Sequence, residues 1–271
     1  MKTNVKKVLG IGLCVLVAAG IGIKIDYENF CKSGGFILEY HGVGYEPWGG
    51  AMVVSPKTFE SHLQYLKDQG YTMVSVKELM EDIRKDKDVS KEIALSFDDG
   101  YKNNFQYALP IMKKFGAKGT FHVINNRIGK DEMYMNESEV KKMIAEGMEI
   151  GAHTSSHNPL GDIDPKYYDW ELGVAKYDLE RRFPGLVIET LAYPMGSFND
   201  AIKAKLKQFG YKQALTGSLY LVDKKMAKEN PFETARVFIE VDEKDSHNFS
   251  WLINRAYKKS YLRARGIDVG D

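Results

Sequence analysis

Two short stretches of the chain carry side chains suited to metal or acid–base chemistry. The first is SFDDG at residues 96–100, where an apolar run ends in the adjacent carboxylates Asp98 and Asp99. The second is HTSSH, which places His153 and His157 four residues apart. Two neutral imidazoles and one carboxylate form a three-ligand set with open positions, as in catalytic zinc sites. The residue types therefore indicate a hydrolytic metal site, although an Asp-Gly turn and two surface histidines would give the same patterns.

The acid pair and the histidine pair suit one shared site. Adjacent side chains at a strand end point in different directions, so one aspartate can bind an ion while the other faces a water molecule. Two carboxylates this close repel each other, and a divalent cation between them and the imidazoles relieves the repulsion. Spacing by four residues predicts that one helical turn brings His153 and His157 to the same face.

These stretches belong to a chain in which strand-like and amphipathic helical segments alternate. We predict strands at residues 36–41, 71–76, 93–97, 119–124, 148–153, 190–194, 211–217 and 235–241. Repeated strand–helix units with buried strands predict an α/β fold, here a distorted (β/α) barrel with seven or eight parallel strands. No Gly-rich phosphate loop follows any of these strands, which argues against nucleotide binding.

Catalytic groups of such barrels lie at the C-terminal ends of the strands. His41 ends the first predicted strand, and Tyr193, Pro194 and Met195 lie at the end of the sixth. Polar groups at several strand ends at once favour a functional site over chance. His122, by contrast, lies inside an apolar strand and is expected to be a core histidine.

Other residues have an ordinary structural interpretation beside a functional one. His62, on the first predicted helix, is expected to be solvated or at a boundary. Tyr45 and Trp48 lie in a Gly-rich loop and would either stack on a sugar ring or pack that loop. The basic run RAYKKSYLRARG at 255–266 is expected to be a solvated helix end, with contact to an anionic polymer or lipid as the alternative.

The N-terminus resembles a targeting segment. Three lysines in the first seven residues precede an uncharged apolar run over residues 8–23, which is shorter than the roughly 17–25 residues of a full membrane span. We predict that residues 1–30 form a hydrophobic helix that serves as a membrane anchor or signal segment, and that 31–271 form one domain. The protein is then exported, and either anchored facing the cell exterior or secreted.

Composition limits the possible partners. The formal net charge of +1 gives no sign of a nucleic-acid partner, and the two cysteines form neither a disulfide framework nor a CxxC metal pattern. Chemistry must then come from histidines and carboxylates. We expect a monomer.

Together the motifs resemble those of the metal-dependent polysaccharide deacetylases. SFDDG matches the first motif of that family, HTSSH the second, and YPMG at 193–196 approximates the third. LEYHGV at 38–43 is most similar to the branch that deacetylates poly-N-acetylglucosamine and related surface glycans. The resemblance covers roughly residues 36–241.

This resemblance implies roles for individual residues. Asp99, His153 and His157 would bind the metal, for which zinc is expected and cobalt or nickel would also be suitable. Asp98 would be the general base that takes a proton from the attacking water. The backbone N–H of Met195 would help to stabilise the oxyanion.

The sequence also departs from the family pattern. The third motif usually begins with an arginine that orients the base, but Leu191 or a neighbour stands there, and Arg236 is expected to supply that charge. The usual tyrosine after the proline is Met195. The C-terminal Leu-x-His motif has no clear match, since His247 lies in a different context. His41 is therefore the expected active-site histidine, which either protonates the leaving amine or positions the substrate.

The predicted function is a metal-dependent hydrolase that removes N-acetyl groups from an amino-sugar polysaccharide outside the membrane. A catalytically weak carbohydrate-binding relative is the alternative, because no general acid is assured. A metal-dependent phosphoesterase is a third possibility, for which Asp and His ligands would also serve.

Overall fold

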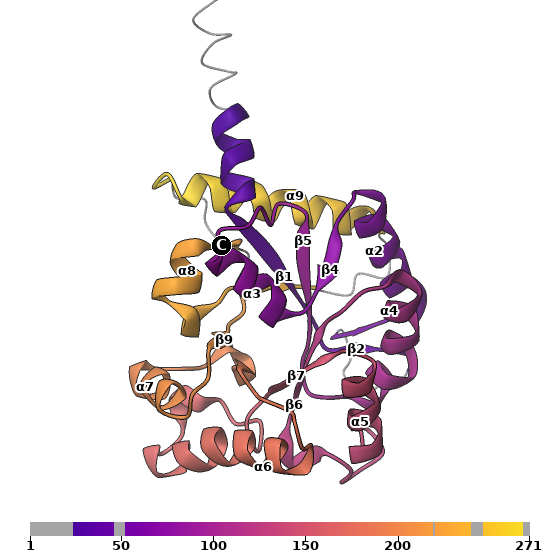
Figure 1. Cartoon of the computed structure of the whole chain (residues 1–271), viewed down its shortest axis with the longest axis vertical. Helices are drawn as coiled ribbons and strands as arrows, with labels where there is room; N and C mark the ends of the chain where they lie inside the picture. The colour runs from indigo at the N-terminus through magenta and orange to yellow at the C-terminus, as the bar shows by residue number, and fades with distance from the viewer. Residues whose placement is uncertain (1–23, 46–51, 219, 240–245, 268–271) are drawn as a thin grey trace, which may run out of the picture.

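The structure is a computed structural model that describes residues 24–45, 52–218, 220–239 and 246–267 (Figure 1). Its strands are β1 (Gly34–Tyr40), β2 (Gly42–Val43), β3 (Val53–Val54), β4 (Thr72–Val74), β5 (Glu92–Phe97), β6 (Thr120–Val123), β7 (Glu149–Ala152), β8 (Thr190–Ala192), β9 (Gln213–Leu215), β10 (Val222–Asp223) and β11 (Val237–Phe238). Its α-helices are α2 (Pro56–Asp68), α3 (Val76–Arg84), α4 (Leu109–Phe115), α5 (Glu137–Ala145), α6 (Ala175–Arg182), α7 (Asp200–Gln208), α8 (Lys224–Glu229) and α9 (Ser246–Arg263). Short 3₁₀ or π turns are η2 (Asn104–Ala108), η3 (Asn125–Arg127), η4 (Leu160–Asp162), η5 (Pro165–Tyr167), η6 (Asp169–Val174), η7 (Pro194–Gly196) and η8 (Pro231–Glu233).

Nine of the described strands form one curled sheet. The order is β10-β1-β5-β6-β7-β8-β9, with β4 added beside β5 and β11 beside β1. Every pair is parallel except β1 with β10. A parallel bridge between Leu215 and Thr234 links β9 to the segment that continues into β11, so the sheet curls back toward β1. The architecture is a deformed (β/α) barrel.

The predicted fold class is therefore confirmed. Each of the eight predicted strands overlaps one observed strand, namely β1, β4, β5, β6, β7, β8, β9 and β11. All seven residues of β1 are buried, as are Ile93 to Phe97 in β5, which explains the nearly continuous apolar runs in the sequence. The very short strands β2, β3 and β10 were not predicted.

Local capping chemistry sets where several helices begin. The Ser55 side chain accepts a hydrogen bond from the N–H of Thr58 at the start of α2, and Pro56 occupies the first turn. Ser75 with Glu78 forms a reciprocal capping box at α3. The Asn199 side chain accepts a hydrogen bond from the Ile202 N–H and caps α7.

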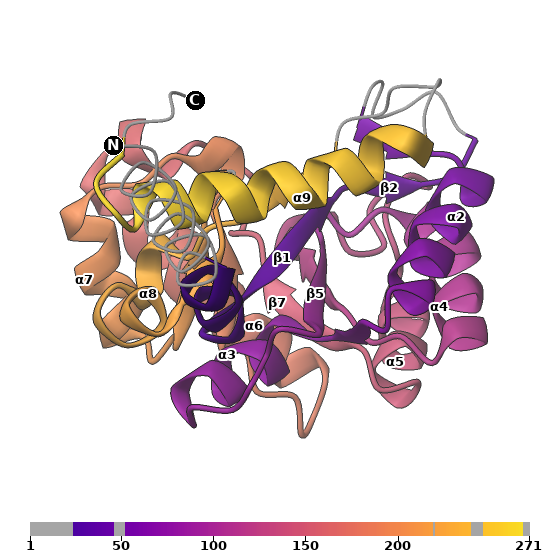
Figure 2. The same cartoon turned by 90° about the horizontal axis from the view of Figure 1, so that it is seen from above.

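The C-terminal helix α9 packs against the first elements of the barrel. Tyr257 lies edge-on to Phe36 of β1 at a centroid separation of 4.4 Å, and Phe249 stacks on His62 of α2 at 4.1 Å. Figure 2 shows α9 crossing the molecule above β1. One face of this basic helix is therefore buried, so it is more than the solvated end that the sequence predicted.

Residues 24–32 are helical and pack on α9. Tyr27 meets Tyr261 edge-on at a centroid separation of 4.9 Å, and Asp26 pairs with Arg265. The domain boundary predicted at residue 30 falls inside this helix. Within the part of the chain that the structure describes, no helix is both long enough and apolar enough to cross a membrane. Most of the predicted anchor, residues 1–23, lies outside the described residues.

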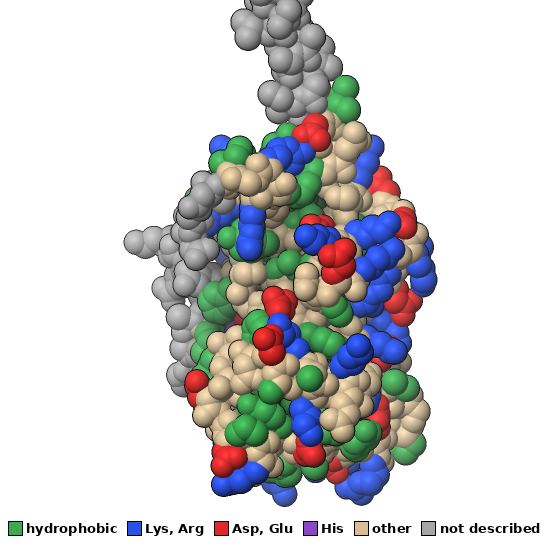
Figure 3. All heavy atoms as spheres, turned by 90° about the vertical axis from the view of Figure 1, so that its left-hand side faces the viewer, with side chains coloured by type: hydrophobic (Ala, Val, Ile, Leu, Met, Phe, Trp, Pro, Cys, Tyr) green, Lys and Arg blue, Asp and Glu red, His purple; other side chains and the backbone are tan. Residues whose placement is uncertain are grey.

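The face that carries α7 and α8 mixes basic and acidic side chains (Figure 3). Lys203 of α7 pairs with Asp200 and Glu233, and Lys224 of α8 pairs with Asp86. Lys203 and Lys224 on this face therefore have acidic partners.

Candidate functional site

A cavity of about 730 Å³ opens at the C-terminal ends of the parallel strands. It is lined by Glu39, His41, Met52, Asp98, Asp99, Tyr101, Ile124, Arg127, Tyr134, His153, Ser156, His157, Tyr193, Met195, Gly196, Gly217, Arg236 and Phe238. Its volume lies in the range of about 300–1,000 Å³ that is usual for ligand sites. All the residues predicted for the site line it, except Pro194, which is buried directly behind its rim.

Strand register brings the two halves of the site together. β1 pairs with β5 so that Tyr40 lies opposite Phe97, and the Asp98 N–H donates to the Tyr40 carbonyl at 3.0 Å. His41 and Asp98 are therefore neighbours at adjacent strand ends. The N–H of His153, which directly follows β7, donates to the carbonyl of Val123 in β6 at 2.9 Å.

Asp99, His153 and His157 form a compact potential ligand group. Asp99 Oδ1 lies 3.4 Å from Nε2 of His153 and 3.2 Å from Nε2 of His157. One potential ligand atom from each residue lies within 4.8 Å of the others. Asp99 and His153 are buried, and His157 is partly exposed toward the cavity.

The two histidines are brought together by a loop, so the predicted helical turn is wrong. Residues 153–157 have no helical assignment, and Thr154 and His157 have φ of 63° and 68°. The Thr154 hydroxyl accepts a hydrogen bond from the His157 N–H at 2.9 Å. Two residues in the left-handed region fold the chain back, and the ring centroids lie 4.8 Å apart.

This group suits a divalent metal by its donor chemistry. The Nδ1 of His153 lies 2.8 Å from the carbonyl oxygen of Ala192, which can only accept, so Nδ1 carries the hydrogen and Nε2 keeps its lone pair. A second hydrogen bond of this kind commonly fixes a metal-binding imidazole. Asp99 Oδ1 is buried without a hydrogen-bond partner. The carboxylate and two imidazoles therefore have the atoms that a zinc-like ion requires.

Asp98 belongs to a different cluster from its neighbour Asp99. Its two oxygens accept a fork of hydrogen bonds from Arg236, at 2.7 Å from Nη1 and 2.8 Å from Nη2. Both side chains are buried. Burial works to raise the pKa of Asp98, but the charges of Arg236 and His153 and the hydrogen bonds from His122 and Arg236 together hold that pKa well below its usual range. Arg236 therefore contacts Asp98 directly, and the carboxylate stays ionised.

Glu39 is part of this cluster and was missed by the sequence reasoning. Its Oε1 lies 3.2 Å from Arg236 Nη2, so one guanidinium serves two carboxylates. Burial raises the pKa of Glu39, while the charge of Arg236 works to lower it. The signal was available: Glu39 is a charged residue inside the otherwise uncharged strand FILEY, where a buried charge requires a partner.

His41 lies where the sequence predicted, at the cavity and beside the Asp98 cluster. One ring nitrogen is within 4.8 Å of carboxylate oxygens of Glu39 and Asp98, and Nδ1 is buried without a hydrogen-bond partner. The ring meets Phe238 edge-on at a centroid separation of 5.6 Å. The residue lines the cavity, where an imidazole is able to exchange a proton with a ligand.

The structure changes the interpretation of two further histidines. His122 is buried as predicted, but its Nδ1 lies 3.4 Å from Asp98 Oδ1, so it also contacts the Asp98 cluster. His62 is only 5% exposed, and its Nδ1 lies 3.1 Å from the Tyr40 hydroxyl. The prediction of a solvated or boundary His62 is wrong, because α9 covers it.

The third motif forms one edge of the cavity. Tyr193 is buried, and its hydroxyl donates to the Phe232 carbonyl at 3.0 Å, so it supports the edge. Pro194 is buried, whereas Met195 is 73% exposed and has φ of 55°. A non-glycine residue in this region of φ is uncommon and often marks a functional turn.

Some predicted residues are not placed by the structure. Trp48 and the His247 side chain lie outside the described residues. Tyr45 is exposed, and its ring meets that of Tyr107 edge-on at a centroid separation of 5.7 Å.

Comparison with known proteins agrees with this site. A family model described as polysaccharide deacetylase matches residues 85–214. The protein YxkH of Bacillus subtilis (strain 168) is 31% identical over 181 residues, which are 66% of this chain and 63% of that protein. A poly-beta-1,6-N-acetyl-D-glucosamine N-deacetylase of Staphylococcus aureus is 26% identical over 171 residues, 59% of each chain. The chain thus spans about three fifths of the length of these curated relatives.

A solved structure shows the same architecture. The Streptococcus pyogenes deacetylase PplD in complex with acetate aligns with a TM-score of 0.70 and 25% identity, covering 76% of this chain and 92% of that one. The matched family region contains Asp98, Asp99, His153 and His157, and the barrel around them is shared. Residues 85–214 therefore match the polysaccharide deacetylase domain, and the fold around them is that of a solved deacetylase.

Proposed function

We propose that the protein is a metal-dependent hydrolase that removes N-acetyl groups from an amino-sugar polysaccharide. The observation that carries this proposal is the pairing of two clusters in one cavity: the ligand group of Asp99, His153 and His157, and the ionised Asp98 held by Arg236. A relative named as a poly-beta-1,6-N-acetyl-D-glucosamine N-deacetylase supports the substrate class.

The proposed roles follow from the contacts of each side chain. A divalent ion, with zinc expected and cobalt or nickel as alternatives, would supply Lewis-acid activation at Asp99, His153 and His157. Asp98 accepts the proton of the attacking water, and Arg236 fixes the direction of its carboxylate.

His41 gives a proton to the leaving amine, because its ring borders the same cavity. The Met195 N–H, in a left-handed turn at the rim, contributes to oxyanion stabilisation. The products are acetate and a free amine on the sugar. His41→Ala is expected to lower turnover about 100-fold and to leave the metal content unchanged.

We also propose that the protein acts outside the membrane, held by its N-terminal segment. Three lysines before the apolar run at 8–23 support this location. Cell fractionation with protease accessibility tests it: digestion of the domain in intact cells is expected, and full protection would contradict export.

The function is tested with the full chain, stripped of metal and resupplied with Zn²⁺ or Co²⁺. Acetate release is measured from N-acetylglucosamine oligomers, peptidoglycan and an O-acetylated glycan. Metal-dependent release from the first two substrates supports the proposal. Release from the O-acetylated glycan alone would show that the enzyme cleaves O-acetyl esters rather than N-acetyl amides. Saccharide binding without acetate release would favour a catalytically weak carbohydrate-binding protein.

A further inference from the structure

One cation at the cavity is used by neither cluster. Arg127 ends η3, directly after β6, and its side chain lines the cavity and is exposed. Within the described part of the chain, no carboxylate oxygen lies within 4.0 Å of its guanidinium nitrogens, whereas Arg236 is occupied by Glu39 and Asp98. Arg127 thus differs from the paired cations over α7 and α8 (Figure 3).

The backbone that carries Arg127 is tied to the histidine loop. The N–H groups of Asn125 and Asn126 donate to the carbonyls of Thr154 and Ser155, each at 3.1 Å. These bonds fix the position of η3 relative to the loop between His153 and His157. Arg127 therefore has a defined place beside the ligand group.

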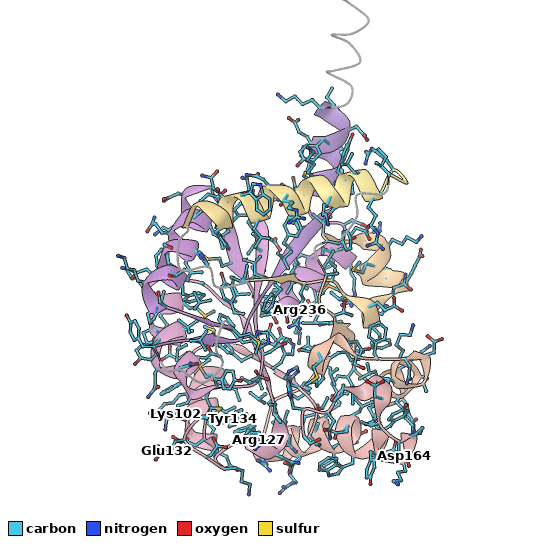
Figure 4. The ribbon with its side chains drawn as sticks, turned by 180° about the vertical axis from the view of Figure 1, so that it is seen from behind. Lys102, Arg127, Glu132, Tyr134, Asp164 and Arg236 are labelled. Atoms are coloured by element: carbon cyan, nitrogen blue, oxygen red, sulfur yellow. The ribbon has the colours of Figure 1, made fainter. Side chains whose placement is uncertain are left out.

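The side chain of Arg127 is also supported. Its guanidinium carbon lies 5.7 Å from the ring centroid of Tyr134, and the Tyr134 ring stacks on that of Tyr101 at 5.5 Å. The chain segments of the two tyrosines form an antiparallel bridge, and the Met135 N–H donates to the Gly100 carbonyl at 3.0 Å. This second connection leads to the loop that holds Asp99. Figure 4 shows Arg127 and Tyr134 together on one side of Arg236.

We propose that Arg127 binds an anionic group, a carboxylate or a phosphate, on the glycan whose acetamide enters the cavity. The inference rests on the proposed function and narrows its substrate class to anionic amino-sugar polymers. A guanidinium is weakly hydrated and donates a planar fork that fits both oxyanions, so an unpaired one at a cavity mouth is suited to them. The same charge disfavours a sugar that already carries an ammonium group, because like charges repel.

Lys102 supplies a matched control at the same rim. Its Nζ lies 3.8 Å from Glu139 Oε1, so this cation already has a carboxylate neighbour. It is also absent from the cavity lining. Lys102→Gln removes one positive charge near Arg127 without removing the guanidinium, and Figure 4 shows the two side chains in the same region.

The test measures binding and catalysis on three oligosaccharides of equal length. One is a neutral N-acetylglucosamine oligomer, one has muramic-acid carboxylates on alternate sugars, and one carries phosphate monoesters. Calorimetry uses the full-length Asp98→Asn protein with zinc, so that substrate persists. We expect at least one anionic oligomer to bind roughly tenfold more tightly than the neutral one, as a charge-assisted hydrogen-bond pair allows.

Substitutions at Arg127 then identify the source of the preference. Arg127→Gln is expected to reduce the ratio of anionic to neutral affinity to about one, Arg127→Lys to retain part of it, and Lys102→Gln to retain all of it. In the active enzyme the same ratio appears in KM more than in kcat. Tighter binding of the carboxylate oligomer would identify a carboxylate as the anionic group on the substrate, and tighter binding of the phosphate oligomer would identify a phosphate.

Equal binding of all three oligomers, no binding of any of them, or a preference that survives Arg127→Gln would overturn the inference. Acetate release from the neutral oligomer without an anionic preference would support the proposed function and contradict the anion site at Arg127. An Arg127-dependent preference with no acetate release from any oligomer would instead contradict the proposed function and support the anion site.

Discussion

The two ends of the barrel both hold buried polar groups, but they use them differently. At the start of β7, the Glu149 carboxylate accepts hydrogen bonds from the hydroxyls of Thr120 and Thr190, at 2.5 and 3.2 Å, and from the Lys77 N–H at 3.0 Å. These donors are neutral, and burial raises the pKa of Glu149. The cluster joins three neighbouring strands to the first turn of α3.

At the opposite end of the barrel, where the cavity opens, several buried polar atoms have no hydrogen-bond partner. Glu39 Oε2, His41 Nδ1 and Asp99 Oδ1 are buried without hydrogen-bond partners. Four of the five described non-glycine residues with positive φ are also at this end, namely Asp99, Thr154, His157 and Met195. Glu92 Oε2, at the start of β5, is buried without a partner as well, so the combination of unsatisfied atoms with strained backbone is what distinguishes the end with the cavity.

The largest expected effect comes from the charge of Asp98. Asp98→Asn keeps the shape of the side chain but cannot accept a proton, so turnover is expected to fall about 1,000-fold. Bound metal, measured by mass spectrometry, should stay at the wild-type level, and Asp99→Asn is the matched variant that should lose it. Metal loss in Asp98→Asn instead would show that the roles of the two aspartates are exchanged.

Substitution of Arg236, the cation shared by Asp98 and Glu39, tests the cavity end through the free energy of unfolding. Arg236→Met leaves Asp98 and Glu39 buried without a compensating charge, which is expected to cost about 3–5 kcal/mol in the free energy of unfolding. Urea denaturation measures this loss. Adding Asp98→Asn to Arg236→Met should recover part of the stability, and no recovery would mean that the loss comes from packing rather than from charge.

His62 tests a buried imidazole away from the cavity. Burial lowers its pKa to about 4, below the unfolded value of roughly 6.5. The unfolded chain therefore binds the proton more readily, so the stabilisation is present above the unfolded pKa and is lost as pH falls. From pH 7 to pH 5 this contribution should decrease by about 2 kcal/mol.

The measurement for His62 compares urea unfolding of the wild type and His62→Phe at the two pH values. The phenyl ring retains the stack on Phe249 but cannot titrate. The variant should lose less stability than the wild type on acidification. An equal loss in both proteins would assign the pH dependence to other groups.

The smallest expected effect is at the structural end. In Glu149→Gln one carboxylate oxygen becomes an amide group that faces hydrogen-bond donors, which should lower the free energy of unfolding by about 1–2 kcal/mol. Turnover per folded molecule should stay unchanged. A lower turnover at unchanged stability would contradict the separation of the two ends.

Much of the site was predictable because it depends on strand ends. Apolar runs followed by polar residues located His41, Asp98, Asp99 and His153 at the C-terminal ends of strands, where a parallel barrel gathers them. Glu39 was missed although its charge inside an apolar strand was visible. Arg236 was inferred from the family pattern, since its sequence neighbours give no sign of Asp98, which lies 138 residues away.

The sequence by itself determined the alternation of strands and helices, several helix caps and the residue types of the metal group, because these depend on local periodicity and short-range hydrogen bonds. Only the tertiary structure decided which carboxylates share Arg236, that a left-handed loop rather than a helical turn joins His153 and His157, and that α9 buries His62. These features depend on strand register and on packing between distant segments, which no local pattern encodes.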